Sequence, residues 1–252
     1  MAEYDKNLST LYTELRSISS MFKLERALMR QFTGNVLDKN VIDMFCGEGS
    51  GSRELKRRGA ASVLGVDYSQ NMIDIAVADE ENECTGTTFI QADLTAPGLV
   101  FGVDADLVTA EFGLCYAKSV DELHVMLENC TSCIKKGGKL VATTSNPPQG
   151  PDWKERNELF SKKYGISYDN YSGVLCDADS TQVQFTLPNG ERSTATNYWY
   201  SPNTYIKLLD KLGFNVEIHH PHICPDEIAE LADELQDYLD NPVMFFIIAT
   251  RR

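Results

Sequence analysis

Residues 41–51, with the sequence VIDMFCGEGSG, constrain the fold of this chain more than any other stretch. The first five residues are mostly apolar, which is typical of a strand covered on both faces. Gly47, Gly49 and Gly51 allow a sharp turn and leave room for a ligand against the backbone. The helix expected from Ser52 would direct the free N–H groups of its first turn towards that ligand. The stretch predicts a strand, a turn and a helix that together bind a ligand with a polar or anionic portion.

Strands and helices alternate on the carboxyl side of this turn, and two helices precede it. Apolar residues at helical spacing predict the two N-terminal helices at 8–19 and 21–32. Further strands are expected at 62–66, 88–91, 105–110 and 139–143, and helices at 70–78 and 120–134, the second of which would end at Gly137-Gly138. This alternation predicts right-handed crossovers and a parallel, doubly wound α/β sheet.

The pattern changes after Pro147-Pro148. Val183, Phe185 and Leu187 alternate with polar residues up to an Asn-Gly pair, which predicts a β-hairpin. The α/β pattern then resumes, with a helix expected at 201–213, a strand at 214–218, an acidic helix at 226–239 and a last strand at 243–250. We therefore expect an N-terminal helical cap at 1–34, a ligand-binding core at 35–146, a β-rich cap insertion at 147–200 and the completion of the core sheet at 201–252.

Composition and charge restrict the class of partner. The 252 residues carry a formal net charge of −14 with only short basic clusters, which disfavours nucleic acid and anionic membranes. The apolar run at 243–249 is too short to span a bilayer. The number of cysteines is odd, seven, and most of them lie in apolar segments, as is typical of reduced thiols. We expect a cytoplasmic protein without a metal site, either a monomer or a homodimer.

Two ligands suit a strand, a glycine turn and a helix, namely a dinucleotide and S-adenosylmethionine. The dinucleotide fingerprint requires the spacing G-x-G-x-x-G, whereas this chain has G-x-G-x-G with Ser52 in the last position of the longer pattern. Asp67, 20 positions after Gly47, ends the second strand and would accept hydrogen bonds from ribose hydroxyls of either ligand. Asp67 alone does not decide between them.

Other residues favour S-adenosylmethionine. Asp43 lies inside a buried strand, where a carboxylate needs a function. It would either fix the turn through backbone N–H groups or face the cationic amino-acid end of the ligand through water. Asp93 ends the third strand and would accept from an adenine amino group, with Ala92 and Leu94 beside the ring. Tyr68 and Met72 would place an aromatic ring and a thioether near the adenosine.

These motifs together resemble the class I S-adenosylmethionine-dependent methyltransferases of the small-molecule type. The resemblance covers roughly residues 38–146 and rests on five segments in the family's order and spacing: Val41–Gly51, Val63–Met72, Thr88–Leu94, Asp106–Tyr116 and Lys136–Thr143. It implies a Rossmann-like, seven-stranded, mostly parallel sheet with helices on both faces and an antiparallel last strand. It also implies a methyl donor, S-adenosylmethionine, that leaves as S-adenosylhomocysteine, with contacts at Gly47, Gly49, Asp67, Tyr68, Met72, Asp93 and the strand end from Glu111 to Leu114. Glu48 departs from the family pattern, because many relatives have a neutral residue there.

Methyl transfer mainly requires that the acceptor be aligned with the S–CH₃ bond, since the sulfonium is already a good leaving group. The sequence shows no catalytic dyad, and the candidates for a base are Glu111, Tyr116 and His219. The acceptor is expected beyond the carboxyl ends of the strands, under the segments added to the core. Candidate acceptor contacts are Tyr12, Arg16, Tyr116, Tyr198 and Tyr200.

The leading hypothesis is a methyltransferase that acts on a nitrogen or oxygen of a small molecule. A protein or RNA methyltransferase shares the same core, although the segment after the fourth strand, Ala110-Glu111-Phe112-Gly113, lacks the Asn-Pro-Pro-Tyr type of motif used for amide methylation. A third hypothesis is a non-catalytic S-adenosylmethionine-binding module, which the intact ligand acids disfavour. An NAD oxidoreductase is the least favoured alternative.

Overall fold

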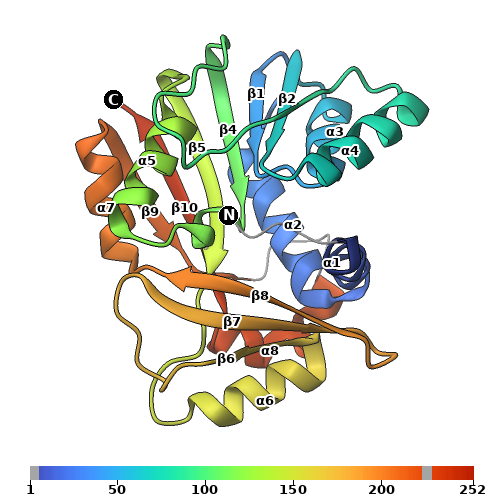
Figure 1. Cartoon of the computed structure of the whole chain (residues 1–252), viewed down its shortest axis with the longest axis vertical. Helices are drawn as coiled ribbons and strands as arrows, with labels where there is room; N and C mark the ends of the chain where they lie inside the picture. Colours follow the sequence, from blue (N-terminus) through green and yellow to red (C-terminus); the bar gives the residue numbers. More distant parts are fainter. Residues whose placement is uncertain (1–5, 223–228) are drawn as a thin grey trace.

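The computed structural model describes residues 6–222 and 229–252, and it contains two sheets (Figure 1). The larger sheet has seven strands in the order β3 (Thr88–Gln91), β2 (Ser62–Asp67), β1 (Asn40–Met44), β4 (Ala105–Glu111), β5 (Ile134–Ser145), β10 (Met244–Arg251) and β9 (Phe214–His219). The pairs among β1 to β5 are parallel, whereas β10 is antiparallel to both of its neighbours. This topology confirms the predicted Rossmann-like fold.

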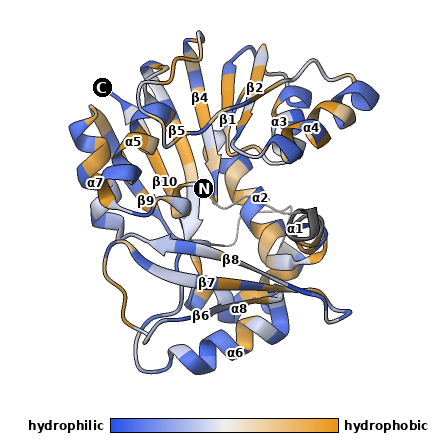
Figure 2. Cartoon of the chain, in the orientation of Figure 1, coloured by the Kyte–Doolittle hydropathy of each residue, from blue (hydrophilic) through white to orange (hydrophobic). Residues whose placement is uncertain are grey.

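Helices cover both faces of this sheet and form two cores. Alternation along β1 places Val41 in one core and Ile42 in the other. The second core packs the sheet against α5 (Val120–Thr131) and α7 (Pro202–Lys211). The first core joins the opposite face to α1 (Lys6–Ile18), α2 (Ser20–Thr33), α8 (Ala232–Asp240) and residues of the smaller sheet. The central strands of the larger sheet are correspondingly apolar over much of their length (Figure 2).

The smaller sheet belongs to the segment between β5 and α7, which we call the cap (residues 147–200). It is antiparallel, with the order β6 (Ile166–Asp169), β7 (Asp179–Thr186) and β8 (Arg192–Trp199). The predicted hairpin at Asn189-Gly190 is confirmed, since it joins β7 to β8. The sequence did not predict α6 (Trp153–Tyr164), in which only Phe160 and Tyr164 are buried, so that its apolar periodicity is weak.

Two predicted element boundaries were wrong. The helix expected at 120–134 ends at Thr131, and Ile134 already pairs with Ala105 as the start of β5. Gly137-Gly138 therefore lies within β5, at a register irregularity, and does not terminate a helix. The helix expected at 226–239 is replaced by a 3₁₀ turn at Ala229–Leu231 followed by α8, and residues 226–228 lie outside the described part of the chain.

No helix among the described residues is long and apolar enough to cross a membrane.

The glycine turn packs directly against the edge of the sheet through Phe89 of β3. Gly49 has a φ of +82°, and a Cβ at this position would lie 2.5 Å from the Phe89 ring. A Cβ at Gly65 of β2 would lie equally close to the same ring. Gly49 is thus required both by its backbone conformation and by the space that Phe89 occupies, and it precedes α3 (Ser50–Arg57) as the N-cap residue.

Gly49→Ala should lower the free energy of unfolding by about 2–4 kcal/mol, because it adds a clash in a packed region to the strain of a positive φ. Gly190→Ala is the matched control: Gly190 has a φ of +88° in the hairpin turn, but a Cβ there meets nothing within 4 Å. We expect the control to lose only about 1–2 kcal/mol. Urea unfolding measures both, and equal losses would contradict the packing role of Phe89.

Candidate functional site

A cavity of about 420 Å³ lies where the glycine turn and the carboxyl ends of β2 and β4 meet α1 and α2, and we call it the donor cavity. Its size is in the range of small-molecule sites. Of the residues predicted for the donor, the acceptor or catalysis, ten line it: Tyr12, Arg16, Asp43, Gly47, Gly51, Asp67, Tyr68, Met72, Glu111 and Tyr116. The structure thus brings residues from the N-terminal helices and from four segments of the core around one space.

Asp67 connects the end of β2 to the glycine turn. Its Oδ2 accepts from the Gly47 N–H at 2.9 Å, and its Oδ1 accepts from the Ser69 N–H at 2.8 Å. Burial raises the pKa of Asp67, although these backbone donors act in the opposite direction. A Cβ at Gly47 would meet nothing within 4 Å, so the backbone at this turn faces open space in the cavity. Each carboxylate oxygen retains a lone pair for a second donor, such as a ribose hydroxyl.

Asp43 lies in the buried middle of β1, and its carboxylate contacts two hydroxyl groups. Oδ1 accepts from Thr109 Oγ1 of β4 at 2.7 Å, and Oδ2 accepts from Ser52 Oγ of α3 at 2.6 Å. These bonds replace the backbone N–H contacts that were one expectation for Asp43. Burial, and to a smaller degree the carboxylate of Glu111, raises the pKa of Asp43 to about 7. The carboxylate is therefore poised to ionise when a cation enters the cavity.

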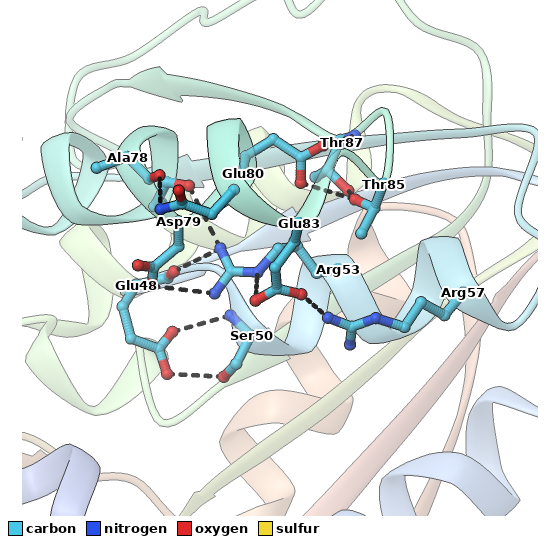
Figure 3. A network of polar contacts seen from close by, with 12 residues as sticks. Glu48, Ser50, Arg53, Arg57, Ala78, Asp79, Glu80, Glu83, Thr85 and Thr87 are labelled. Atoms are coloured by element: carbon cyan, nitrogen blue, oxygen red, sulfur yellow. Dashed lines mark hydrogen bonds and ion pairs between the residues drawn. The ribbon is translucent and has the colours of Figure 1, made fainter.

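Arg53 fixes the glycine turn from behind, as Figure 3 shows. Its guanidinium is almost fully buried and donates to the Glu48 backbone carbonyl at 3.0 Å and to the Ala76 carbonyl of α4 (Gln70–Glu83) at 3.3 Å. The same guanidinium forms ion pairs with Asp79 and Glu83 on α4. The Glu48 carboxylate accepts from the backbone and hydroxyl of Ser50, which accounts for this departure from the family pattern as a local cap of α3.

A charged cluster from α1, α2 and β4 closes one side of the donor cavity. Arg16 Nη2 lies 2.9 Å from Glu25 Oε2 and 2.7 Å from Glu111 Oε2. Glu25 is fully buried, and burial together with the neighbouring Glu111 carboxylate raises its pKa well above the usual value. One guanidinium thus bridges two carboxyl groups, of which we take Glu25 to be the protonated one.

Two phenylalanines line the donor cavity with unusual backbone conformations. Phe45 follows β1 with a φ of +59°, and Phe112 follows β4 with a φ of +50°. The Phe45 ring fills the space beside Gly113, where a Cβ would clash with it. Positive φ values in bulky residues are costly and cluster at ligand sites, so this strain marks the strand ends as a functional region.

A second, much smaller cavity of about 30 Å³ lies between the N-terminal helices, the cap and the first residue of β10, and we call it the cap cavity. Tyr12, Phe112 and Tyr116 line both cavities. The remaining lining of the cap cavity is mostly apolar or aromatic, for example Phe22, Phe185 and Tyr168. These three shared side chains therefore form the border between the two spaces.

Eight predicted site residues line neither cavity: Gly49, Ala92, Asp93, Leu94, Leu114, Tyr198, Tyr200 and His219. Leu94 and Leu114 are buried in the second core. Asp93 Oδ1 accepts from the backbone and hydroxyl of Thr95, so it caps its own turn, and its contact with an adenine remains a prediction. His219 packs against Phe32, with ring centroids 5.0 Å apart and the rings tilted by 43°, and its Nε2 lies 3.4 Å from Glu217 Oε2.

Tyr198 and Tyr200 do not line either cavity, because side chains alternate between the two faces of a strand. Tyr200 is buried, and its hydroxyl donates to the Ala117 carbonyl at 2.8 Å. Tyr198 packs against the second core. The side chain of β8 that reaches the cap cavity is that of Asn197, which precedes Tyr198 and faces the opposite side of the strand.

Sequence reasoning also missed Glu25, Arg26 and Phe45, all of which line the donor cavity or contact a residue that does. Glu25 and Arg26 follow Leu24 in α2, whose amphipathic pattern predicts a helix. A charged residue in such a pattern only weakly indicates a functional site. Phe45 resembles an ordinary apolar strand residue in the sequence, and Phe112 was expected at the site only as part of the strand end from Glu111 to Leu114. Their backbone conformation depends on tertiary contacts and leaves no local pattern.

Comparison with known proteins identifies the core. Residues 41–138 match a family profile described as a methyltransferase domain. The chain carries a class I S-adenosylmethionine-dependent methyltransferase domain. S-adenosylmethionine is the methyl donor of this domain. The open backbone at Gly47, the available lone pairs of Asp67 and the carboxyl groups of Asp43 and Glu111, which both line the cavity, fit this ligand.

Similar proteins support this domain at low identity. The demethylmenaquinone methyltransferase of Lactococcus lactis subsp. lactis is 27% identical over 165 residues, which are 64% of this chain and 64% of that protein. A ubiquinone biosynthesis O-methyltransferase of Coxiella burnetii is 32% identical over 111 residues, 43% of this chain and 44% of that protein. The chain thus spans less than two thirds of either relative. The structure of an S-adenosylmethionine-dependent methyltransferase from Mesorhizobium loti has the same fold, with a TM-score of 0.61 and 22% identity over 90% of this chain and 98% of that one.

Asp43→Asn should make donor binding to the methyltransferase domain less dependent on pH. Wild-type affinity for S-adenosylmethionine should rise from pH 5.5 to about 7 and then level off. The reason is that the positively charged groups of the methyl donor favour the ionised form of Asp43, whose pKa is about 7. Asn cannot ionise, so the variant should bind more weakly at pH 8 and lack most of this rise. Isothermal titration across this pH range measures both profiles, and parallel profiles would refute the assignment.

The same substitution has the opposite effect on stability. A carboxyl whose pKa is raised in the folded state disfavours folding above its unfolded pKa, and this cost reaches its full size above the folded value of about 7. Asp43→Asn should therefore stabilise the protein relative to wild type by about 2 kcal/mol more at pH 8 than at pH 5.

Glu25→Gln and Glu111→Gln should separate the two carboxyl groups that contact Arg16. If Glu25 is protonated, Gln replaces it almost isosterically and should change the free energy of unfolding by less than about 1 kcal/mol. Glu111→Gln removes the ionised partner of a largely buried guanidinium and should cost about 2 kcal/mol, reduced by the partial exposure of the pair. Urea unfolding at pH 7 compares them, and a larger loss for Glu25→Gln would reverse the assignment.

Proposed function

We propose that this chain transfers a methyl group from S-adenosylmethionine to a nitrogen or oxygen of a small-molecule acceptor. The observation that carries the proposal is the shared border of the donor and cap cavities at Tyr12, Phe112 and Tyr116. Helix α1 and the cap sheet enclose the acceptor side, with Leu11 and Leu15 of α1 packed in the same core as Val183 and Phe185 of β7. A small, mostly apolar space beside the donor suits one end of a small molecule better than a polymer.

The relatives and the surface charge support the same class of acceptor. One relative is named a demethylmenaquinone methyltransferase and the other a ubiquinone biosynthesis O-methyltransferase, which favours a small-molecule acceptor for this chain as well. The formal net charge of −14 opposes binding to a phosphate backbone. These points favour a small-molecule acceptor over RNA and, less strongly, over protein.

Catalysis in this proposal comes mainly from positioning. The donor supplies, when bound, a methyl group on a positively charged sulfur that needs no acid to leave. Asp67 and the glycine turn orient the donor, while Phe112 and Tyr116 align the acceptor and exclude water from the path of in-line displacement. A neutral amine needs no base. For a hydroxyl acceptor, Glu111 and Tyr116 are the lining groups suited to taking up the proton.

We further propose a cytoplasmic monomer or homodimer. The six cysteines within the described residues are free thiols, and Cys130 and Cys133 are among them. Such thiols suit a reducing compartment.

Asp67→Ala should weaken S-adenosylmethionine binding at least about tenfold, because it removes a charged acceptor and releases Gly47. Asp74→Ala is the control, since Asp74 lies on the exposed side of α4 and bonds only Gln70 among the contacts described. Titration calorimetry measures binding to both variants. Equal affinities would remove Asp67 from the donor site.

Transfer itself is tested with donor labelled in the methyl group and panels of phenols, quinols and amines, beside a tRNA pool and a protein extract. Label in the small-molecule fraction supports the proposal. Label found only in RNA or protein would replace it with the macromolecular alternative. Tight donor binding with no transfer to any panel would favour a non-catalytic binding module.

A further inference from the structure

Asn197 of β8 has a buried side chain with one oxygen unpaired. The residue is 6% exposed, and its Nδ2 reaches Ser145 Oγ only at a long 3.5 Å. Within the described residues, Asn197 Oδ1 is buried without a hydrogen-bond partner. Buried polar atoms of this kind are rare and costly, and each calls for a reason such as a ligand. The side chain lines the cap cavity, so the reason is to be sought there.

The cap cavity is suited to a small, neutral group. Its volume of about 30 Å³ corresponds to roughly one or two heavy atoms, so it takes the end of a molecule and not a whole ring. None of its described lining residues is an Asp, Glu, Lys, Arg or His. Its polar groups are Asn197, Ser145 and tyrosine hydroxyls, and the remainder is apolar. A charged group would therefore be desolvated there without a counterion.

The border side chains show where the rest of such a molecule lies. Tyr12, Phe112 and Tyr116 line both cavities, so an acceptor that enters the cap cavity with one end has its body against these rings. Its opposite end then faces the donor cavity. Flat rings pack favourably against aromatic side chains, which favours an aromatic body.

We propose that Asn197 is a specificity-determining residue that reads a hydroxyl or N–H group at the end of the acceptor remote from the methylated atom. The inference rests on the proposed function. The acceptor is then a neutral, single-ring or similarly flat molecule with a hydrogen-bond donor at this end. Its donor group satisfies Asn197 Oδ1, and the bond fixes the distance at which the reactive end meets the methyl group.

Thr181 of β7 provides a matched control. It is the register partner of Asn197, it is 1% exposed, and its Oγ1 is also buried without a partner within the described residues. It does not line the cap cavity. Thr181→Val therefore changes a comparable buried polar group of the same sheet without altering the surface that an acceptor would contact.

The test uses phenol and toluene, which have nearly the same shape and differ in the hydrogen-bond donor. Their binding to wild type, Asn197→Leu, Asn197→Ser and Thr181→Val is measured by ligand-observed NMR, with and without saturating S-adenosylhomocysteine. We expect wild type and Thr181→Val to bind phenol at least about tenfold more tightly than toluene. Asn197→Leu should reduce this ratio to about twofold or less, and Asn197→Ser should give an intermediate ratio.

A stability measurement separates recognition from a structural role. If Asn197 serves a ligand, Asn197→Leu removes an unsatisfied buried oxygen and should not lower the thermal midpoint of the ligand-free protein. A lower midpoint together with an unchanged ratio would show that Asn197 is structural. Equal binding of phenol and toluene to wild type, or no binding of either, would overturn the inference without the use of any variant.

The two proposals fail in different ways. S-adenosylhomocysteine that does not bind to wild type would refute the proposed function, whatever the phenol ratio. S-adenosylhomocysteine that binds, with no preference for phenol, would refute only the role of Asn197.

Discussion

The donor site depends on one buried carboxylate, that of Asp43. Its two oxygens bond Thr109 of β4, the strand that already pairs with β1, and Ser52 of α3, so a single side chain links the three elements that surround the glycine turn. Burial makes its ionisation costly, as its raised pKa shows. Asp43 thus lines the donor cavity as a carboxyl group whose ionised form a cationic ligand would stabilise. Asp67 and Arg53 then fix the turn itself from its two sides.

The N-terminal helices join this donor machinery to the acceptor side. Helix α1 contributes Tyr12 and Arg16 to the donor cavity, while Leu11 and Leu15 pack into the core that the cap shares with the main sheet. Arg16 also reaches Glu111 at the end of β4. A change in the packing of the cap would therefore be transmitted to the wall of the donor cavity through α1. In the proposed function, the two substrates meet at the side chains that line both cavities.

The fold, and the grouping of several predicted residues around one cavity, were predictable because their determinants are local in sequence. Glycine spacing, apolar strands and acids at or near strand ends predict a turn flanked by acids, and Asp43, Gly47, Gly51 and Asp67 do line the cavity. Glu25, Phe45 and Asn197 were not predictable, because their burial and backbone conformation arise only when distant elements pack. The glycines of β5 were misread for the opposite reason: a local helix-stop pattern was overridden by strand pairing with β4.

The interior position of β10 has a consequence for the order of assembly during translation. Residues 244–251 lie between β5 and β9 and pair with both, so β9 has no neighbour in the sheet until β10 has been synthesised. Phe245 and Phe246 of this strand are fully buried on opposite faces, and each completes one of the two cores. A nascent chain on the ribosome therefore exposes both half-built cores until this segment leaves the exit tunnel, which makes the stage just before it a natural point for chaperone capture.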